Sequence, residues 1–402
     1  SQHPYLMEKI NDLSTPCFIL DPKELERSVC GFQEALNSKF GNSIVGYSVK
    51  TNSVPFCLKC AGKLGAYAEV VSSDEYELAL ACGFSKGNII YNGPLKSKET
   101  FIDAILHGAI VNIETKRELS WLKELPHDKK YNVGLRVNIN VSHVSPEDAD
   151  GENDNSRFGF SDETEELKDA LSFIEQIDNV ELAGLHIHRT THSRSVRFYK
   201  KSIEYACQTI KKYGLSINYL DVGGGFFGIF PNKPTYQQYS DAFYEVLSKF
   251  EMQNLCVIVE PGNALVASCF SFISEVIDVK HVEKELWFIT TNGSRNDIDP
   301  FFKKSTYLCE TVDDNKNRDI AKEQIVSGCT CLEYDRMHTL KDKPLLSVGD
   351  RIVYNNVGAY TMCLSPMFIR YIPNIYIKNE DSFELIREKW TAQEHIVKNK
   401  FK

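Results

Sequence analysis

The sequence predicts an α/β protein that consists of a (β/α)₈ TIM barrel and a C-terminal antiparallel β-domain. Short β-branched runs alternate with helical patterns over roughly 240 residues, and such a barrel is built from alternating strands and helices. After Ala267 the strand-like runs follow one another without intervening helices, which is typical of an antiparallel β-domain. The chain of 402 residues also exceeds the size at which one hydrophobic core usually stops growing.

Eight strand-like runs define the predicted barrel. Each is short, rich in β-branched residues and bounded by polar residues or glycines. The runs cover residues 44–50, 66–72, 88–93, 109–115, 132–140, 180–188, 217–225 and 255–262. Helix-like segments lie between them at residues 53–65, 72–83, 97–108, 115–125, 165–177 and 195–214. The barrel is expected to occupy residues 24–267.

The predicted β-domain is built from strand-rich segments at residues 269–293, 323–331, 348–358 and 368–378. A further strand-like run, TPCFILD at residues 15–21, lies ahead of the barrel. We expect this run to return to the β-domain. The β-domain would then comprise residues 1–23 and 268–402.

Composition and charge exclude several classes of protein. No apolar run approaches the about 18 residues of a membrane span, and the stretch SQHPYLMEKI is too polar for a secretory leader. A cytoplasmic location is therefore expected. The net charge is −9 and the sequence has no basic patch, so it lacks the cluster of positive charge that nucleic-acid-binding proteins carry. A small molecule is the expected partner.

The 12 cysteines are scattered along the chain. Cys57 with Cys60 and Cys329 with Cys331 are the closely spaced pairs, and neither has a second pair of matching spacing to complete a zinc site. The sequence therefore predicts reduced thiols and no bound metal.

Polar residues and glycines stand at the ends of the predicted strands. Because a barrel assembles its active site at the carboxyl ends of its strands, these residues are expected to meet. They are Lys50, Glu69, Asn92, Gly93, Arg136, His188, Gly223, Gly224, Gly225 and Glu260. Such a set suits pyridoxal 5'-phosphate, which needs a lysine for covalent attachment, a partner for its ring nitrogen, amide donors for its phosphate and a stacking surface.

Each of these residues also has an ordinary interpretation. Lys50 could be a surface lysine at a strand end, and His188 could be a hydrogen-bonded core residue. The glycines 223–225 could serve only a tight turn, and Glu260 could cap the turn that begins at Pro261. Their joint occurrence at strand ends, in an order compatible with one barrel, favours a cofactor site.

Motifs along nearly the whole chain carry a family resemblance. They are TPCFILD, YSVKTNS, AEVVSSDEYELA, IIYNGPLKS, SRFGF, GLHIH, LDVGGGFFG, VEPG, GCTCLEYD and VGDRIVYNNVGAYT. Together they resemble the fold-type III pyridoxal-phosphate decarboxylases, the family of diaminopimelate, ornithine and arginine decarboxylases, whose barrel is shared with alanine racemase. The resemblance implies pyridoxal 5'-phosphate as cofactor, decarboxylation of an amino acid, and a head-to-tail homodimer with two shared active sites.

The resemblance also implies a role for each matching residue. Lys50 would carry the cofactor, Glu260 would pair with the protonated ring nitrogen, and His188 would stack on the ring. Cys331 of the second subunit would donate a proton to the substrate carbon after carbon dioxide leaves. The other cofactor contacts would be Glu69, Arg136, Thr191, Gly223, Gly224, Gly225, Gly262 and Tyr360. Glu75 would belong, with Glu69 and Arg136, to a polar network around the lysine and the ring. The expected substrate contacts are Arg157, Glu333, Asp335 and Tyr360.

The chain departs from the family pattern around the expected phosphate. Asn263 stands after Glu-Pro-Gly, where the family has an arginine that helps to hold the phosphate. Thr190 and Thr191 replace a glycine–serine pair, although Thr191 keeps a hydroxyl donor. Arg189 or Arg194 could restore the missing charge, and Arg189 is the expected substitute.

A second departure concerns the substrate. Leu332 stands after Cys331, where diamine-forming members have an acidic residue, and Glu333 follows one place later. A buried ammonium without a partner is costly. The preferred substrate is therefore expected to carry a neutral, carboxylated, conjugated or carrier-linked distal group, with Arg157 or Arg194 as contacts.

Two other functions remain open at this stage. One is a catalytically silent regulator that keeps the fold, although it would have no chemical need for Lys50, Glu260 and Cys331 together. The other is an amino-acid racemase, which would need a second base, typically a tyrosine, where GCTC supplies a thiol.

Overall fold

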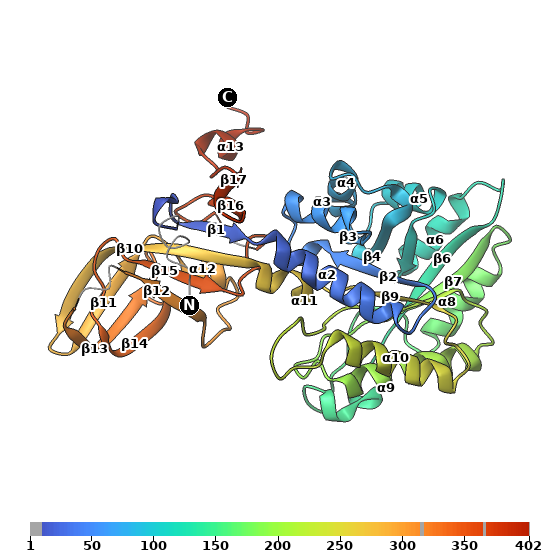
Figure 1. The fold of residues 1–402 in the computed structure, drawn as a ribbon. Coiled ribbons are helices and arrows are strands. Elements are labelled where there is room, and N and C mark those ends of the chain that lie inside the picture. The colour runs from blue at the N-terminus through green and yellow to red at the C-terminus, as the bar shows by residue number, and fades with distance from the viewer. Residues whose placement is uncertain (1–9, 314–316, 365–366, 402) are drawn as a thin grey trace. The chain divides into compact units, whose positions relative to one another are not determined.

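The computed structural model describes residues 10–313, 317–364 and 367–401. The chain divides into two compact units (Figure 1). The barrel unit comprises Glu26–Leu265, and the β-unit comprises the chain up to Leu25 and from Val266 onward. Among the described residues, no helix combines the length and the apolar character needed to cross a membrane.

Eight parallel strands close the barrel, each paired with the next and the last with the first. They are β2 (Ser43–Ser48), β3 (Tyr67–Ser72), β4 (Ile89–Leu95), β5 (Ile110–Ile113), β6 (Tyr131–Val137), β7 (Val180–Ile187), β8 (Tyr219–Asp221) and β9 (Cys256–Val259). Most of their residues are buried, as expected of parallel strands covered by helices. The predicted (β/α)₈ barrel is confirmed.

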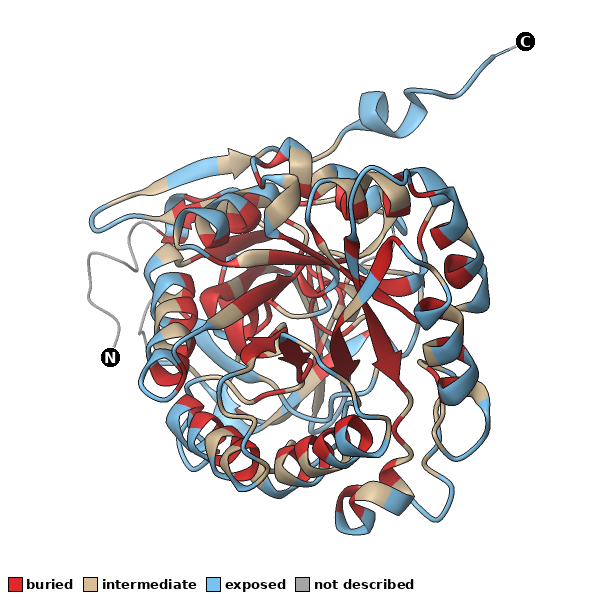
Figure 2. Cartoon of the chain, turned by 90° about the vertical axis from the view of Figure 1, so that its right-hand side faces the viewer, coloured by how far each residue is buried: buried red, intermediate tan, exposed pale blue. Residues whose placement is uncertain are grey.

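Helices surround the barrel with buried faces toward the strands and exposed faces outward (Figure 2). They are α2 (Pro22–Asn37), α3 (Pro55–Lys63), α4 (Ser73–Ala81), α5 (Lys98–Leu106), α6 (Lys116–Trp121), α7 (Val141–Val144), α8 (Glu166–Glu175), α9 (Val196–Lys212), α10 (Tyr236–Lys249) and α11 (Asn263–Val266). Short 3₁₀ turns are η1 (Val49–Thr51), η2 (Lys86–Asn88), η3 (Leu122–Glu124) and η4 (Pro146–Asp148). Helices α2 and α10 were not among the predicted segments. A capping box of Thr235 and Gln238 marks the start of α10 and could have revealed it.

Several helices begin at a serine or threonine that lies at the end of a strand or in the loop after it. The side chain of this residue accepts a hydrogen bond from a backbone amide of the first turn, which satisfies a donor that the helix leaves unpaired. The capping residues are Ser72, Ser97, Thr115, Ser195 and Thr235, before α4, α5, α6, α9 and α10. These caps fix the loops at the carboxyl ends of the strands.

The β-unit contains a nine-stranded sheet in the order β14-β13-β11-β10-β1-β16-β17, in which β15 pairs with both β10 and β12. The strands are β1 (Cys17–Leu20), β10 (Phe270–Glu283), β11 (Leu286–Thr291), β12 (Leu308–Val312), β13 (Ile320–Ser327), β14 (Arg336–Pro344), β15 (Arg351–Asn355), β16 (Asn374–Lys378) and β17 (Phe383–Arg387). The unit also contains η5 (Ala267–Cys269), α12 (Arg295–Ile298) and α13 (Ala392–Ile396).

Strand β1 lies inside this sheet, antiparallel to β10 and parallel to β16. The expectation that TPCFILD returns to the β-domain is therefore confirmed. Strands β11 and β13 form a second parallel pair, so the sheet is mostly rather than wholly antiparallel. Both parallel pairs join strands that are not consecutive in the chain, so no hairpin sets their relative direction.

Candidate active site

Lys50 stands in η1, directly after the end of β2. Its Nζ donates hydrogen bonds to Glu69 Oε1 at 2.9 Å and to Ser48 Oγ at 3.0 Å. The Lys50 side chain is 41% exposed, whereas that of Glu69 on β3 is 2% exposed. The lysine therefore leaves a buried strand end with its amine accessible and oriented by a carboxylate.

Glu69 itself is only partly satisfied. Burial raises the pKa of this carboxyl, and the charge of Lys50 opposes that effect. Its second oxygen, Oε2, is buried and accepts no hydrogen bond from the described residues. A buried acceptor without a partner is unfavourable, and a bound group at this strand end could satisfy it.

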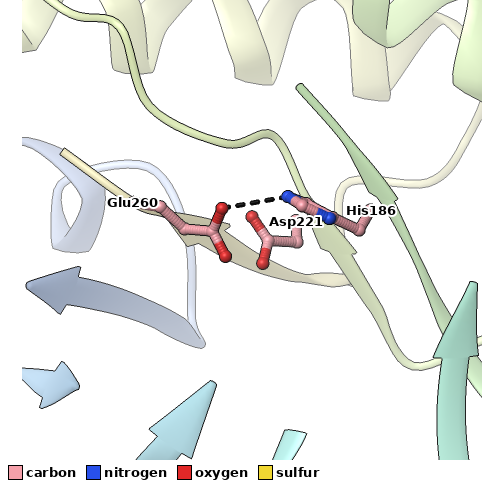
Figure 3. Close-up of side chains that lie close together, drawn as sticks. All are labelled: His186, Asp221 and Glu260. Carbon is pink, nitrogen blue, oxygen red and sulfur yellow. Dashed lines mark hydrogen bonds and ion pairs between the residues drawn. The ribbon is translucent and has the colours of Figure 1, made fainter. Parts of the chain in front are cut away.

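Glu260 directly follows β9, and both of its carboxylate oxygens accept hydrogen bonds. His186 on β7 donates from Nε2 to Glu260 Oε1 at 2.9 Å, and Asn92 on β4 donates from Nδ2 to Oε2 at 2.6 Å. Figure 3 shows the histidine ring directed at the carboxylate. Burial alone would raise the pKa of Glu260, but the charge of His186 and these hydrogen bonds lower it below the usual range. Glu260 is therefore held ionised.

Asp221, at the end of β8, lies beside this pair (Figure 3). Its Oδ1 accepts a hydrogen bond from the Gly223 amide at 3.0 Å. Burial, followed by the adjacent charge of Glu260, raises the pKa of Asp221 well above its usual value. Two carboxyl groups this close cannot both ionise cheaply, so Asp221 is the neutral member and Glu260 the charged one.

The three side chains are also of types that bind metals, and one ligand atom of each lies within 4.8 Å of the others. His186 Nε2 and Glu260 Oε1 are hydrogen-bonded to each other, however, so both groups are already paired. We interpret His186, Asp221 and Glu260 as a network that fixes the protonation of Glu260.

A relay of amides sets the orientation of Asn92. The Tyr219 hydroxyl donates to Asn112 Oδ1 at 2.7 Å, and Asn112 Nδ2 donates to Asn92 Oδ1 at 2.8 Å. Because its oxygen is occupied in this way, Asn92 turns its NH₂ group toward Glu260. Gly134 makes room for this relay, since a Cβ there would overlap the Tyr219 hydroxyl and the Asn112 side chain.

His188 follows β7 and is held as a neutral ring. The Gly224 amide donates to His188 Nδ1 at 3.1 Å, which places the ring proton on Nε2. Burial, together with the charges of Arg136 and Lys50, lowers the pKa of His188 well below its usual value. Gly223 has φ +76°, and a Cβ there would overlap the His188 ring. A neutral, flat imidazole is suited to stacking against an aromatic cofactor.

The glycine run after β8 leaves two amide donors available. The N–H groups of Gly225 and Phe226 donate to no acceptor in the described part of the chain. Tyr199 fixes the loop by donating to the Gly224 carbonyl at 2.5 Å. Thr191 is buried, and its hydroxyl oxygen accepts from the Arg194 amide at 3.0 Å, which leaves its proton free to donate.

The guanidinium groups of Arg136 and Arg157 both lie over the ring of Phe158. Arg136 on β6 is 3.4 Å from Glu114 and also donates to the His188 carbonyl at 3.3 Å. The guanidinium of Arg157 is 4.3 Å from the centre of the Phe158 ring, and that of Arg136 is 4.8 Å from it. Arg157 has no carboxylate partner among the described residues.

Glu75 and Gly262 help to position the backbone around the site. Glu75 Oε1 accepts from the Val71 amide at 2.9 Å and so holds the end of β3, and burial raises its pKa. A Cβ on Gly262 would overlap Thr51, so glycine lets the Glu-Pro-Gly turn approach the segment that carries Lys50.

The predicted residues of the β-unit lie mainly in the loop after β13. Cys331 and Glu333 are exposed, and Leu332 is half-buried. Asp335 is buried and accepts from Ser294 at 3.0 Å, from the Arg295 amide at 2.8 Å, and from the Thr330 hydroxyl at 2.6 Å. Both of its oxygens are occupied within its own unit. We therefore assign Asp335 to the scaffold of this loop instead of to substrate.

Tyr360, also in the β-unit, is 39% exposed and has φ +53°. A bulky residue in this left-handed region is rare and is retained where the surrounding structure imposes it, often at functional sites.

His186, Asp221 and Asn112 were not among the predicted site residues. A signal for two of them was available, because His186 precedes His188 by two positions and Asp221 precedes Gly223 by two. Residues two apart on a strand lie on the same face. Asn112 and Tyr219 had no such signal.

The residues present fit pyridoxal phosphate. The barrel offers an accessible amine at Lys50, an ionised carboxylate at Glu260, a neutral ring at His188 and unused amides at Gly225 and Phe226. Residues 24–267 match the family described as pyridoxal-dependent decarboxylase, pyridoxal binding domain. The chain belongs to this family.

The curated relatives that match this chain include proteins named as diaminopimelate decarboxylases. A probable chloroplastic diaminopimelate decarboxylase of Oryza sativa subsp. japonica is 28% identical over 388 residues, covering 93% of this chain and 77% of that protein. The diaminopimelate decarboxylase of Aquifex aeolicus is 24% identical over 370 residues, covering 90% and 85%.

Solved structures share the fold. The diaminopimelate decarboxylase of M. jannaschii superposes with a TM-score of 0.86 at 22% identity, covering 98% of this chain and 94% of that one. The arginine decarboxylase of Paramecium bursaria Chlorella virus gives a TM-score of 0.77 at 21% identity, covering 93% and 98%.

This decarboxylase is a pyridoxal-5'-phosphate-dependent carboxy-lyase that acts on an amino acid. The two alternatives, a silent regulator and a racemase, are not favoured by these comparisons.

The assignment of Lys50 predicts that Lys50→Ala loses both the covalent cofactor and carbon dioxide release. The reason is that the substitution removes the amine that Glu69 orients. Borohydride reduction followed by mass spectrometry would locate any cofactor adduct. Lys59→Ala, a change at an exposed lysine of α3, is the matched control and should retain both properties. A reducible adduct that persists in Lys50→Ala would refute the assignment.

Proposed function

We propose that this enzyme removes the α-carboxylate of an amino acid whose distal end is carboxylated or conjugated. The observation that carries this proposal is the exposed Arg157 guanidinium, which stacks on Phe158 and pairs with no carboxylate of the described chain. An arginine without an acid partner favours an anionic group on the ligand, because it can bind a carboxylate through two hydrogen bonds. The relatives are named diaminopimelate decarboxylases, and diaminopimelate carries a second carboxylate.

Leu332 supports the same choice. It is half-buried in the loop after β13 and offers no charge to a substrate ammonium. The neighbouring Glu333 is exposed, so its attraction would be weakened by solvent and salt. Free ornithine and lysine should therefore be poor substrates.

Pyridoxal phosphate, when bound, supplies an electron sink for the charge left on the substrate α-carbon. Lys50 would hold the cofactor, and Glu69 would orient the lysine amine toward it. Glu260, kept ionised by His186 and Asn92, would hold a proton on the ring nitrogen, since an adjacent anion stabilises the protonated ring. These residues would make the sink effective.

The remaining barrel residues would position the cofactor. His188 would stack on the ring face. The Gly225 and Phe226 amides would donate to the phosphate, and the Thr191 hydroxyl would add a further donor.

We also infer a head-to-tail homodimer in which Cys331 of the partner subunit donates a proton to the α-carbon after carbon dioxide leaves. Cys331 is exposed and makes no hydrogen bond to any described residue, as a group that serves a neighbouring subunit would. Tyr360 would be a further contact of the phosphate, as the family resemblance implies. A cytoplasmic location is inferred as well, because the 12 cysteines form no disulfide within the described part of the chain, which suits a reducing compartment.

The shared site predicts complementation between two inactive variants. A mixture of Lys50→Ala and Cys331→Ala chains should recover activity, because a mixed dimer contains one site with both residues intact. Random exchange gives about a quarter of the wild-type rate. The control is Lys50→Ala mixed with Glu260→Gln, which should recover nothing, because both defects lie in the barrel. If subunit exchange is demonstrated and neither mixture recovers, the site lies within one chain.

The substrate assignment predicts a rank order of kcat/KM. Amino acids with a carboxylated or conjugated distal end should exceed ornithine and lysine, as measured by carbon dioxide release. Arg157→Met should reduce kcat/KM for carboxylated substrates by about tenfold or more while changing that for ornithine little. The highest kcat/KM for unmodified ornithine or lysine would contradict the inference from Leu332.

A further inference from the structure

The phosphate of the cofactor carries negative charge that its proposed donors do not neutralise. A phosphate monoester carries close to two negative charges at neutral pH. The Gly225 and Phe226 amides and the Thr191 hydroxyl are neutral donors, and Asn263, after the Glu-Pro-Gly turn, is neutral as well. A cation near the glycine run would therefore strengthen binding, because charge-assisted hydrogen bonds are stronger than neutral ones.

Arg189, the cation expected from the sequence, already has other partners. It donates to the Asp154 carboxylate, to the Asp154 carbonyl at 3.0 Å and to the Ile139 carbonyl at 2.8 Å. Arg197 is likewise bound to Asp148, with an N–O distance of 2.8 Å. Both guanidinium groups hold the loops at the barrel opening together, and their charges are neutralised there.

Arg194 differs from both. Its guanidinium lies 5.1 Å from the centre of the Phe227 ring, two residues beyond Gly225, and it forms no ion pair with any described residue. Lys233 lies over the same ring at 4.8 Å, but it is exposed, so its charge is more strongly screened by solvent. Arg194 is partly buried and is the better-placed cation.

The backbone of Arg194 is fixed against the glycine run. Its N–H donates to Thr191 Oγ1 at 3.0 Å, and its carbonyl accepts from the Tyr239 hydroxyl at 2.7 Å. The same Tyr239 oxygen accepts from the Phe227 amide at 3.3 Å, which joins the two segments directly. These bonds hold Arg194 at φ +48°, a left-handed conformation that is unfavourable for arginine.

The charge of Arg194 also reaches the glycine run. Burial raises the pKa of Tyr199 well above its usual value, and Arg194 acts in the opposite direction. The Tyr199 hydroxyl is the group that donates to the Gly224 carbonyl. The guanidinium therefore lies close enough to influence the loop electrostatically.

We propose that Arg194 supplies the positive charge that binds the cofactor phosphate, opposite the amides of Gly225 and Phe226 and beside the hydroxyl of Thr191. This inference rests on the cofactor site proposed above. Thr191 then has two functions, because its oxygen fixes the Arg194 backbone while its proton is available to the phosphate.

The test compares cofactor binding with and without the phosphate. Apo-protein carrying Arg194→Met, which keeps an apolar contact with Phe227, is titrated with pyridoxal phosphate and with pyridoxal. The Kd for pyridoxal phosphate should rise by about ten- to a hundredfold, as expected for the loss of one charge-assisted bond, while the Kd for pyridoxal stays unchanged. Arg194→Lys, which keeps the charge, should recover most of the loss.

Arg189→Met and Lys233→Met are the matched controls and should each change the Kd for pyridoxal phosphate by less than about threefold. An unchanged Kd in Arg194→Met would overturn the proposal. So would an equal loss for both ligands, or a loss that appears in Arg189→Met instead. If Arg194→Met fails to fold by circular dichroism, Arg194→Gln is judged by the same criteria. A wild-type protein that binds the cofactor without a borohydride-reducible link would contradict Lys50 and leave the Arg194 comparison intact.

Discussion

The hydrogen-bonded carboxylate of Glu260 is the interaction on which the rest of the barrel interior depends. An isolated charge in this interior would be strongly unfavourable, and it is tolerated because His186 and Asn92 donate to its two oxygens. These donors come from β7 and β4, whereas Glu260 follows β9. They meet only because the barrel closes. The fold therefore creates a fixed anion where the proposed mechanism needs one.

The glycine run connects this anion to the rest of the site. A Cβ on Gly224 would overlap the Glu260 carbonyl, and one on Gly223 would overlap the His188 ring. The absence of side chains at these positions lets the stacking histidine, the anion and the phosphate donors lie together. Arg194 and Tyr239 then hold the far end of the run. A change at one of these glycines should therefore disturb several functions together.

The barrel, the strand ends and most of the polar residues at them could be predicted from the sequence. Strand-like runs are local features of the sequence, and the active site of such a barrel lies at the carboxyl ends of its strands. His186 and Asp221 were overlooked because they lie inside apolar runs, where a core interpretation is the ordinary one. Asn112 acts through Tyr219, far away in sequence, so only the structure reveals it. Arg189 and Arg194 lie in the same loop and differ only in their tertiary partners, which the sequence does not contain.

The central claim is that Glu260 is an anion in the folded protein and keeps a proton on the cofactor ring nitrogen. Nitrogen-15 NMR of the holoenzyme, prepared with pyridoxal phosphate labelled at that nitrogen, tests this claim most directly. The account predicts the chemical shift of a protonated ring in the wild-type protein and that of an unprotonated ring in Glu260→Gln. An unprotonated ring in the wild-type protein, or the same shift in both proteins, would contradict it.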